Sequence, residues 1–390
     1  MTLPKLWTAN FLLSCFSSFL MAFAFYLVGS VMPFYISSSF GTNDAQTGLI
    51  LASYITAALA VRPFSGYLVD TFPRKKILIY SLIFFIILFY GYMQAKTLFF
   101  LVLFRVLHGF TWSTTTTANS TLTIDIIPSE RRGEGIGYYG LTSTLAMSIG
   151  PMLGLMLYDH YPVEVNFYFA IIFGIIALLL AILIKAPYKQ PITTKEPISL
   201  DRFILVRATP IGVNLLGIGI CYGALFAFAA LYGKELNVQN TGMFFMFMAL
   251  GMTLSRFFTG KLIDKGYIHQ LMSISLTLLA LSLILFGLAT NSFLFFTAAF
   301  FIGISYGVLS PTFQNLFINM APAEKRGTAN STFFTFYDLG IGLGMVFAGK
   351  VAHYIGYNFI FIIGGALCIG TLFFYLFVSK PLYNKNKINT

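Results

Sequence analysis

"RPFSGYLVDTFPRKK", residues Arg62–Lys76, runs from an apolar segment into a cluster of three positive charges. The chain repeats this phrase as "RFFTGKLIDKG", residues Arg256–Gly266. Each copy places an arginine, a glycine and an aspartate at the same relative positions. A motif repeated in this way at the end of an apolar segment indicates that the chain is built from two copies of one unit.

The match between the two copies extends well beyond this phrase. Residues 194 positions apart agree at Gly48 and Gly242, and "PSERRGEG" (Pro128–Gly135) matches "PAEKRGTA" (Pro322–Ala329). The offset stays constant without gaps over roughly a hundred residues, which makes chance similarity between apolar sequences a poor explanation. We therefore predict two halves of equal architecture.

Composition indicates that these halves lie in a membrane. Of the 390 residues, 57% are hydrophobic and 9% are charged, whereas about 25% charged residues is usual in a soluble domain. Apolar runs of about 20 residues recur, and each is long enough to cross a bilayer as a helix. The first run, Phe11–Ile36, is too long for the apolar region of a signal peptide. The sequence thus predicts a polytopic membrane protein.

We predict an all-α integral membrane fold with twelve helices in two six-helix, pseudo-symmetric bundles. The domain boundaries expected are an N-terminal bundle at 1–186, a cytoplasmic linker at 187–207, a C-terminal bundle at 208–379 and a cytoplasmic tail at 380–390. The predicted spans are 9–36, 44–69, 77–95, 98–124, 134–158, 166–186, 208–232, 240–263, 270–290, 293–319, 327–352 and 358–379.

The distribution of charge predicts the topology. The net charge is +11, and most lysines and arginines fall on one side of the membrane when the N-terminus is placed in the cytoplasm. The positive-inside rule then places both termini in the cytoplasm of a cell whose inner (plasma) membrane holds the protein. The basic balance is explained by topology, so no nucleic-acid partner is expected. Three scattered cysteines form neither a disulfide framework nor a metal-ligand pattern.

Three motifs resemble the major facilitator superfamily of transporters. "GYLVDTFPRKK" is similar to its loop signature after span 2, although Thr71 and Pro73 depart from it. "LVLFRVLHGF" (Leu101–Phe110) resembles its fourth-span signature, centred on Arg105. "AMSIGPMLG" (Ala146–Gly154) resembles the fifth-span signature of the drug:proton antiporter branch. The resemblance covers essentially the whole chain and implies a transporter that works by alternating access.

The duplicated phrase predicts a cytoplasmic gate. Asp70 and Asp264 end spans that face the cytoplasm, where a carboxylate can approach helix N-termini of the other half. The alternative is that the basic residues only anchor the topology. We expect the second latch to be the weaker one, because Asp264 lacks a following basic run. The predicted gating residues are Gly66, Asp70, Arg74, Lys75, Lys76, Arg62, Arg256, Asp264, Gly150, Pro151 and Gly154.

Asp338 is the acidic residue placed deepest within a span, and a carboxylate there needs a cation, a proton or water. Span 4 carries Arg105 and His108 at the start of a polar stripe with helical spacing. We predict that Asp338 takes up and releases the coupling proton, and that its partner is Arg105 or His108 across a cavity, or a substrate cation. Arg62 and Arg256 are expected to serve structural roles at helix ends. If they faced the cavity instead, their charge would favour anionic or zwitterionic cargo.

Polar and aromatic side chains within the spans are candidates for lining the substrate cavity. Packing against lipid or neighbouring helices is the alternative for each one, and hydroxyl groups can also bond back to their own helix. The predicted cavity residues are Tyr26, Tyr54, Trp112, Thr115, Thr116, Asn119, Asn214, Tyr222, Tyr306, Gln314 and Asn315.

The function predicted is proton-coupled export of a small amphipathic, anionic or zwitterionic solute or drug by an antiporter. A proton-coupled uptake symporter is the first alternative, and a polytopic membrane enzyme is the second. The sequence lacks a nucleotide-binding loop and a clustered catalytic set. We expect a monomer whose partners are the small-molecule substrate, protons and membrane lipid, with no metal and no cofactor other than the proton gradient.

Overall fold

The computed structural model describes residues 4–42, 44–187 and 200–388, and the regular structure in these ranges is helical. Twelve helices are long and apolar enough to cross a membrane, and each overlaps one predicted span. They are α1 (Ala9–Phe40), α2 (Asp44–Thr71), α3 (Arg74–Gln94), α4 (Leu98–Ile126), α5 (Arg132–His160), α6 (Glu164–Leu183), α7 (Thr209–Glu235), α8 (Met243–Asp264), α9 (Ile268–Gly287), α10 (Ser292–Asn319), α11 (Arg326–Ile355) and α12 (Tyr357–Phe374).

The connecting segments are short and partly helical. A π-helical turn at Tyr375–Ser379 leads from α12 into α13 (Lys380–Asn386), so the predicted tail begins as a helix. Within the predicted linker, two 3₁₀ turns occupy Leu200–Arg202 and Val206–Ala208. Lys189, Pro191, Lys195 and Pro197 of that linker lie outside the described residues.

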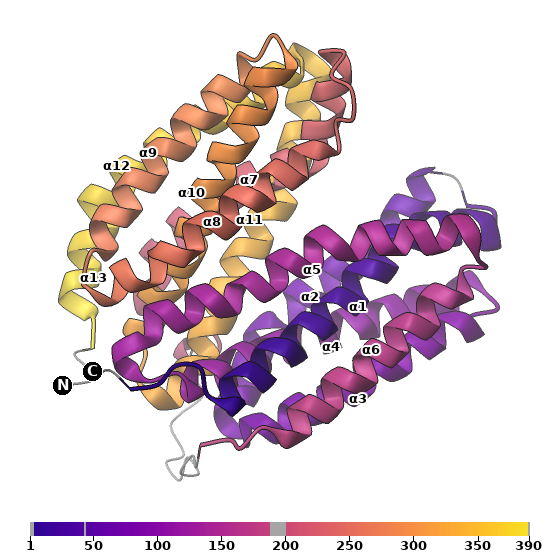
Figure 1. Ribbon diagram of the computed structural model, residues 1–390, viewed down its shortest axis with the longest axis horizontal. Helices are drawn as coiled ribbons and strands as arrows, with labels where there is room; N and C mark the ends of the chain where they lie inside the picture. The colour runs from indigo at the N-terminus through magenta and orange to yellow at the C-terminus, as the bar shows by residue number, and fades with distance from the viewer. Residues whose placement is uncertain (1–3, 43, 188–199, 389–390) are drawn as a thin grey trace.

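The helices form two bundles with the same internal packing, which confirms the predicted fold class (Figure 1). In the first bundle α1 packs against α5 and α6, α2 against α4, and α3 against α4 and α6. In the second bundle α7 packs against α11 and α12, α8 against α10, and α9 against α10 and α12. Every pair in the first half therefore has its counterpart six helices later.

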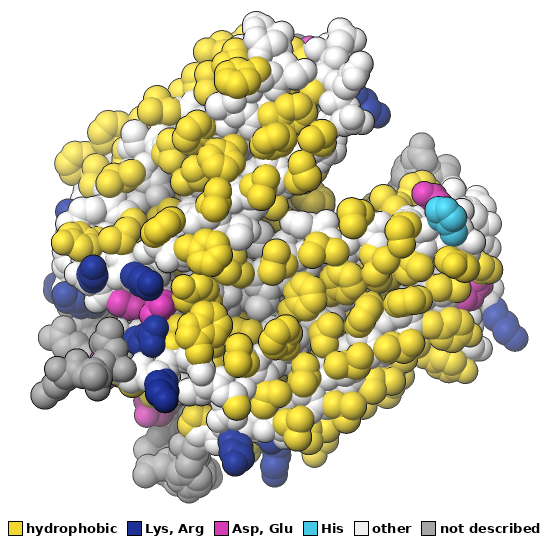
Figure 2. All heavy atoms as spheres, in the orientation of Figure 1, with side chains coloured by type: hydrophobic (Ala, Val, Ile, Leu, Met, Phe, Trp, Pro, Cys, Tyr) yellow, Lys and Arg dark blue, Asp and Glu magenta, His cyan; other side chains and the backbone are white. Residues whose placement is uncertain are grey.

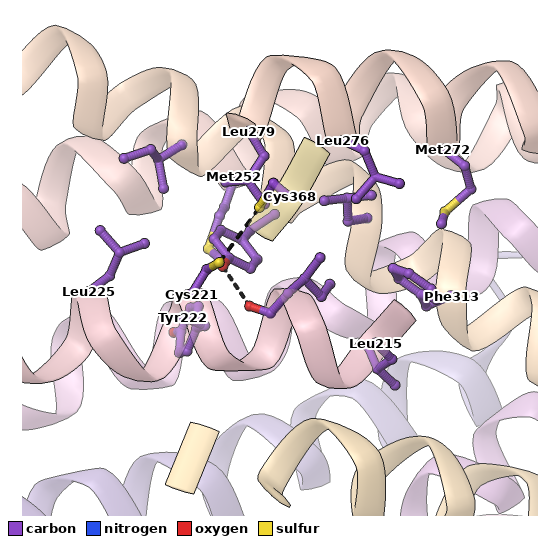
Figure 3. Packing of buried hydrophobic residues seen from close by; sticks show 14 of the residues in the cluster. Leu215, Cys221, Tyr222, Leu225, Met252, Met272, Leu276, Leu279, Phe313 and Cys368 are labelled. Atoms are coloured by element: carbon purple, nitrogen blue, oxygen red, sulfur yellow. Dashed lines mark hydrogen bonds between the residues drawn. The ribbon is translucent and has the colours of Figure 1, made fainter. Parts of the chain in front are cut away.

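Each bundle has its own apolar core. Figure 3 shows part of the second core, where Cys221 on α7 lies 3.6 Å from Cys368 on α12 among leucine and methionine side chains. Glycine permits close helix approach here, since a Cβ on Gly303 of α10 would collide with the backbone of Met248 on α8. The outer surface between the helix ends is largely apolar (Figure 2), as a surface facing lipid requires.

The two bundles meet at the end of the molecule that carries both termini (Figure 1). The main contacts between them join α2 with α11 and α5 with α8, and smaller ones join α4 with α11 and α5 with α10. At the opposite end the bundles diverge, and the surface is hollowed between them (Figure 2). This arrangement leaves a central space closed at one end only.

Candidate functional site

A cavity of about 340 Å³ lies between the bundles, lined by side chains from both of them. Three charged residues border it: Arg62 on α2, Arg256 on α8 and Asp338 on α11. Most of the remaining lining is aromatic, methionine or hydroxyl-bearing. A space of this size and character suits a small amphipathic molecule.

Asp338 pairs with Arg62 across the boundary between the bundles. Nη2 of Arg62 lies 2.9 Å from Oδ2 of Asp338, and Nε of Arg62 donates to the same oxygen over 3.0 Å. Nη1 donates to Oγ1 of Thr116 on α4 over 2.7 Å, and the guanidinium stacks on the Phe334 ring at 4.5 Å. The Arg62 side chain is 3% exposed and the Asp338 side chain 25%, so the carboxylate is the more accessible member of the pair from the cavity.

This pairing differs from the sequence-based expectation, which made Arg105 or His108 the partner of Asp338. Arg105 instead donates from Nη2 to the backbone oxygen of Leu51 over 3.0 Å. His108 is buried, and its Nδ1 lies 2.8 Å from the Tyr92 hydroxyl. Both residues therefore belong to the packing between α4 and its neighbours α2 and α3.

The predicted cavity residues divide into two groups. Those that line the cavity are Tyr26, Trp112, Thr116, Tyr222, Tyr306 and Gln314. The others are buried between helices and do not belong to its lining: Tyr54, Thr115, Asn119, Asn214 and Asn315. Several residues of the second group donate a hydrogen bond to a backbone carbonyl. For example, the Thr115 hydroxyl donates to the carbonyl of Thr111, and the Asn315 amide donates to that of Pro311. Hydroxyl and amide groups that bond within the fold are not available to a substrate.

Arg256 faces the cavity without a partner among the described residues. Arg256 is 7% exposed. Its Nε and Nη1 atoms have no hydrogen-bond acceptor in the described part of the chain. The guanidinium lies against Gly140 of α5, where an added Cβ would come within 2.6 Å of Nη1. The sequence-based expectation was a structural role at helix ends for both Arg62 and Arg256, but the structure places both on the cavity wall.

The end that carries the termini is closed by Asp70. Its carboxylate accepts hydrogen bonds from the N–H groups of Gly327 (2.7 Å) and Thr328 (2.6 Å) and from the Thr328 hydroxyl (2.8 Å). These donors belong to the first turn of α11, where the helix dipole also favours negative charge. Gly66 lets the helices approach, because a Cβ there would lie 2.6 Å from that of Ser331.

Asp264 makes the equivalent contact between α8 and α5. It accepts from the N–H groups of Gly133 (2.6 Å) and Glu134 (2.9 Å). Unlike Asp70, which is buried, Asp264 is exposed. Water therefore competes for its hydrogen bonds, and the contact contributes less to closure.

Asp125, at the end of α4, was missed by the sequence analysis. It forms ion pairs with Arg74 and, over 2.9 Å, with Arg326 of the other bundle. Arg74 also donates to the backbone oxygen of Ala323 over 2.8 Å. The signal available in the sequence was an acidic residue directly before the repeated "PSERRGEG" segment. Asp125 therefore provides a third contact between the bundles at the closed end.

The remaining predicted gating residues lie at the closed end or along α5. Lys75 donates to the backbone oxygen of Ile182 over 2.7 Å, and Lys76 is exposed. Pro151 lies within α5, and Gly150 and Gly154 flank it where α5 packs closely on α1. Among the described residues, no group of three or more His, Cys, Asp and Glu side chains could hold a metal ion.

Comparisons with known proteins agree with this architecture. The model of the Major Facilitator Superfamily matches residues 14–271 and 241–390. The staphylopine export protein of Staphylococcus aureus is 24% identical over 87% of this chain and 89% of its own length. The quinolone resistance protein NorA of Staphylococcus aureus is 26% identical over 86% of this chain and 88% of its own.

A solved structure has the same fold. The human organic anion transporter MFSD10 (TETRAN) superimposes with a TM-score of 0.78, covering 94% of this chain and 98% of that one at 16% sequence identity.

Proposed function

Since the chain belongs to the Major Facilitator Superfamily, we propose that it is a proton-coupled antiporter that exports a small amphipathic, anionic or zwitterionic solute. The observation that carries this proposal is the ion pair between Asp338 and Arg62 on the wall of a cavity shared by the two bundles. Export is favoured by the relatives, since one is named for staphylopine export and another for quinolone resistance.

We place the closed end in the cytoplasm of a cell with the protein in its plasma membrane. Lys and Arg side chains gather near the termini at this end (Figure 2), as the positive-inside rule requires of a cytoplasmic face. With this orientation the structure corresponds to an outward-open state. The six-helix units 1–186 and 208–379 would then rock about the central cavity to expose it to the cytoplasm.

Asp338 is proposed to carry the coupling proton. Its carboxylate is more exposed than Arg62, so a proton entering the cavity from outside can reach it. Protonation removes the charge that holds Arg62, which breaks the pair between α2 and α11. The same two helices form the Asp70 contact at the closed end, so a change in this pair can be passed to the gate. Arg105 and His108, which contact other groups, would act only through the packing of α4.

Asp338→Asn tests the assignment in everted membrane vesicles with an acidic interior. The wild-type protein should release protons from the lumen, as a pH-sensitive dye reports, when quinolones or carboxylate metal chelators are added. The variant should lose this release. Asp159→Asn is the matched control, because it changes an exposed aspartate at the C-terminal end of α5, away from the closed end. Full proton release by Asp338→Asn would overturn the role of this carboxylate.

Uptake symport is the second candidate, and one feature favours it. Protonation of Asp338 frees the charge of Arg62, and the added positive charge would attract an anionic cargo at the same moment. The same vesicle experiment separates the two modes, since in symport protons and cargo move in the same direction and in antiport they move in opposite directions.

A further inference from the structure

The two arginines of the duplicated phrase occupy equivalent positions on α2 and α8, but their surroundings differ. Arg62 is held by the Asp338 carboxylate and stacks on the Phe334 ring, both on α11. With the constant offset of the two halves, the positions on α5 that correspond to these residues are Thr144 and Gly140. The face of α5 next to Arg256 therefore carries neither the counter-charge nor the ring that α11 provides for Arg62.

The result is a recess that carries a positive charge. Gly140 and Thr144 both line the cavity, and the Arg256 guanidinium lies against Gly140. The guanidinium is more than nine-tenths buried and has no acceptor for two of its nitrogens in the described part of the chain. Burial of a charge without a partner is strongly unfavourable, so an arginine at this position indicates a partner that comes from elsewhere.

We propose that Arg256 binds a carboxylate or a similar anionic oxygen group of the cargo, which takes the place that Asp338 occupies beside Arg62. A guanidinium donates two parallel hydrogen bonds to such a group, which favours planar oxyanions over a neutral amide. Tyr222 and Tyr337 also line the cavity and supply aromatic surface for an apolar part of the same molecule. The inference rests on the proposed transport function and names the substrate class of that site.

Equilibrium binding tests the proposal without a proton gradient. Trp112 lines the cavity, and the sequence contains two tryptophans. In a Trp7→Phe background, energy transfer from Trp112 reports binding of N-dansyl-phenylalanine, and the carboxamide of this compound is the neutral counterpart. We expect the carboxylate to bind at least tenfold more tightly than the amide to protein in lipid nanodiscs at one pH.

Four variants test whether the preference for the carboxylate comes from Arg256. Arg256→Gln should remove it, whereas Lys261→Gln, which removes an exposed charge from the same helix, should leave it intact. Thr144→Asp should also remove it by giving Arg256 an internal partner, and the similarly sized Thr144→Asn should weaken carboxylate binding much less. Because Thr144→Asp satisfies a buried charge, it should raise the melting temperature, and this gain should be absent in an Arg256→Gln background.

The inference would be overturned if the two compounds bound equally well or if neither bound up to about 1 mM. It would also be overturned if the preference for the carboxylate remained in Arg256→Gln. These outcomes leave the proposed antiport untouched, because proton movement in vesicles is measured separately. Conversely, carboxylate selectivity that depends on Arg256, combined with an absence of coupled proton movement, would support the binding site and refute the transport mode.

Discussion

Substitution of Asp70 by asparagine should open the gate at the closed end. The carboxylate accepts three hydrogen bonds from Gly327 and Thr328, and hydrogen bonds to charged groups contribute about 1.5–3 kcal/mol each. Asparagine keeps one acceptor oxygen, turns an amide donor toward the first turn of α11 and removes the favourable charge at the helix N-terminus. A net loss of about 2–3 kcal/mol follows, which is a shift of about 30- to 150-fold toward the open gate.

Distances between spin labels across the gate measure this shift. Thr71 at the end of α2 and Glu324 just before α11 are exposed, so labelled cysteines there should not disturb the contact. The three native cysteines are first replaced by serine or alanine. The wild-type protein should give mainly the short distance, and Asp70→Asn should add a longer one.

Asp264→Asn is the matched control, because it removes the equivalent carboxylate from the other half. This residue is exposed and accepts two hydrogen bonds, so its loss should cost about 1 kcal/mol or less. If Asp70→Asn left the distances unchanged, or if Asp264→Asn opened the gate further, the assignment of the main latch to Asp70 would be wrong.

Two further substitutions test the closed end and the packing of the second bundle. Asp125→Asn removes the carboxylate that Arg74 and Arg326 share, whereas Arg74 keeps its contact with Asp70 at 3.4 Å. The closed gate should be destabilised by about 2 kcal/mol, and unchanged label distances would contradict this. Gly303→Leu drives a side chain into the backbone of α8 and should cost about 1–3 kcal/mol, seen as a lower melting temperature, whereas Gly370→Leu meets open space and should change it little.

The fold could be predicted from the sequence because its signals are local or repeated. Twelve apolar runs, the repeated phrase and the side preference of Lys and Arg each act over short stretches. The helix ends were less accurate, since α1 continues to Phe40 and α11 to Ile355, beyond the spans at 9–36 and 327–352. Backbone hydrogen bonding can carry a helix past the edge of the apolar run, which hydropathy does not register.

The partner of Asp338 could not be found from helical periodicity. A stripe of polar residues shows which face of a helix is polar, but it does not show which of these residues lies at the same depth in the membrane as Asp338. At 1.5 Å per residue, Arg62 lies about 14 Å from the closed-side end of α2, Thr116 about 15 Å from that of α4, and Asp338 about 18 Å from that of α11. Arg105 lies about 32 Å from the same end of α4. Counting residues from the repeated motifs would have paired Asp338 with Arg62.

At the closed end, the duplication is kept in the backbone contacts and lost in the side-chain charges. Asp70 and Asp264 each accept two N–H groups from the opposite half at matching positions. Asp125, which holds two arginines, corresponds to Asn319 in the second half. Among the described residues, the α2–α11 side therefore carries more charged contacts across the closed end than the α5–α8 side.

The cavity has lost its symmetry in a complementary way. On the α2–α11 side Asp338 pairs with Arg62, whereas on the α5–α8 side the corresponding residue is Thr144 and none of the described residues forms an ion pair with Arg256. In the proposed mechanism, the α2–α11 side exchanges the proton and the α5–α8 side binds an anionic group of the cargo. Asp338 and Arg256 belong to different pairs of helices, so a proton bound at the first and a cargo anion bound at the second would each act on a different side of the gate. On this proposal, the coupling of proton and cargo would arise from the positions where the two halves differ.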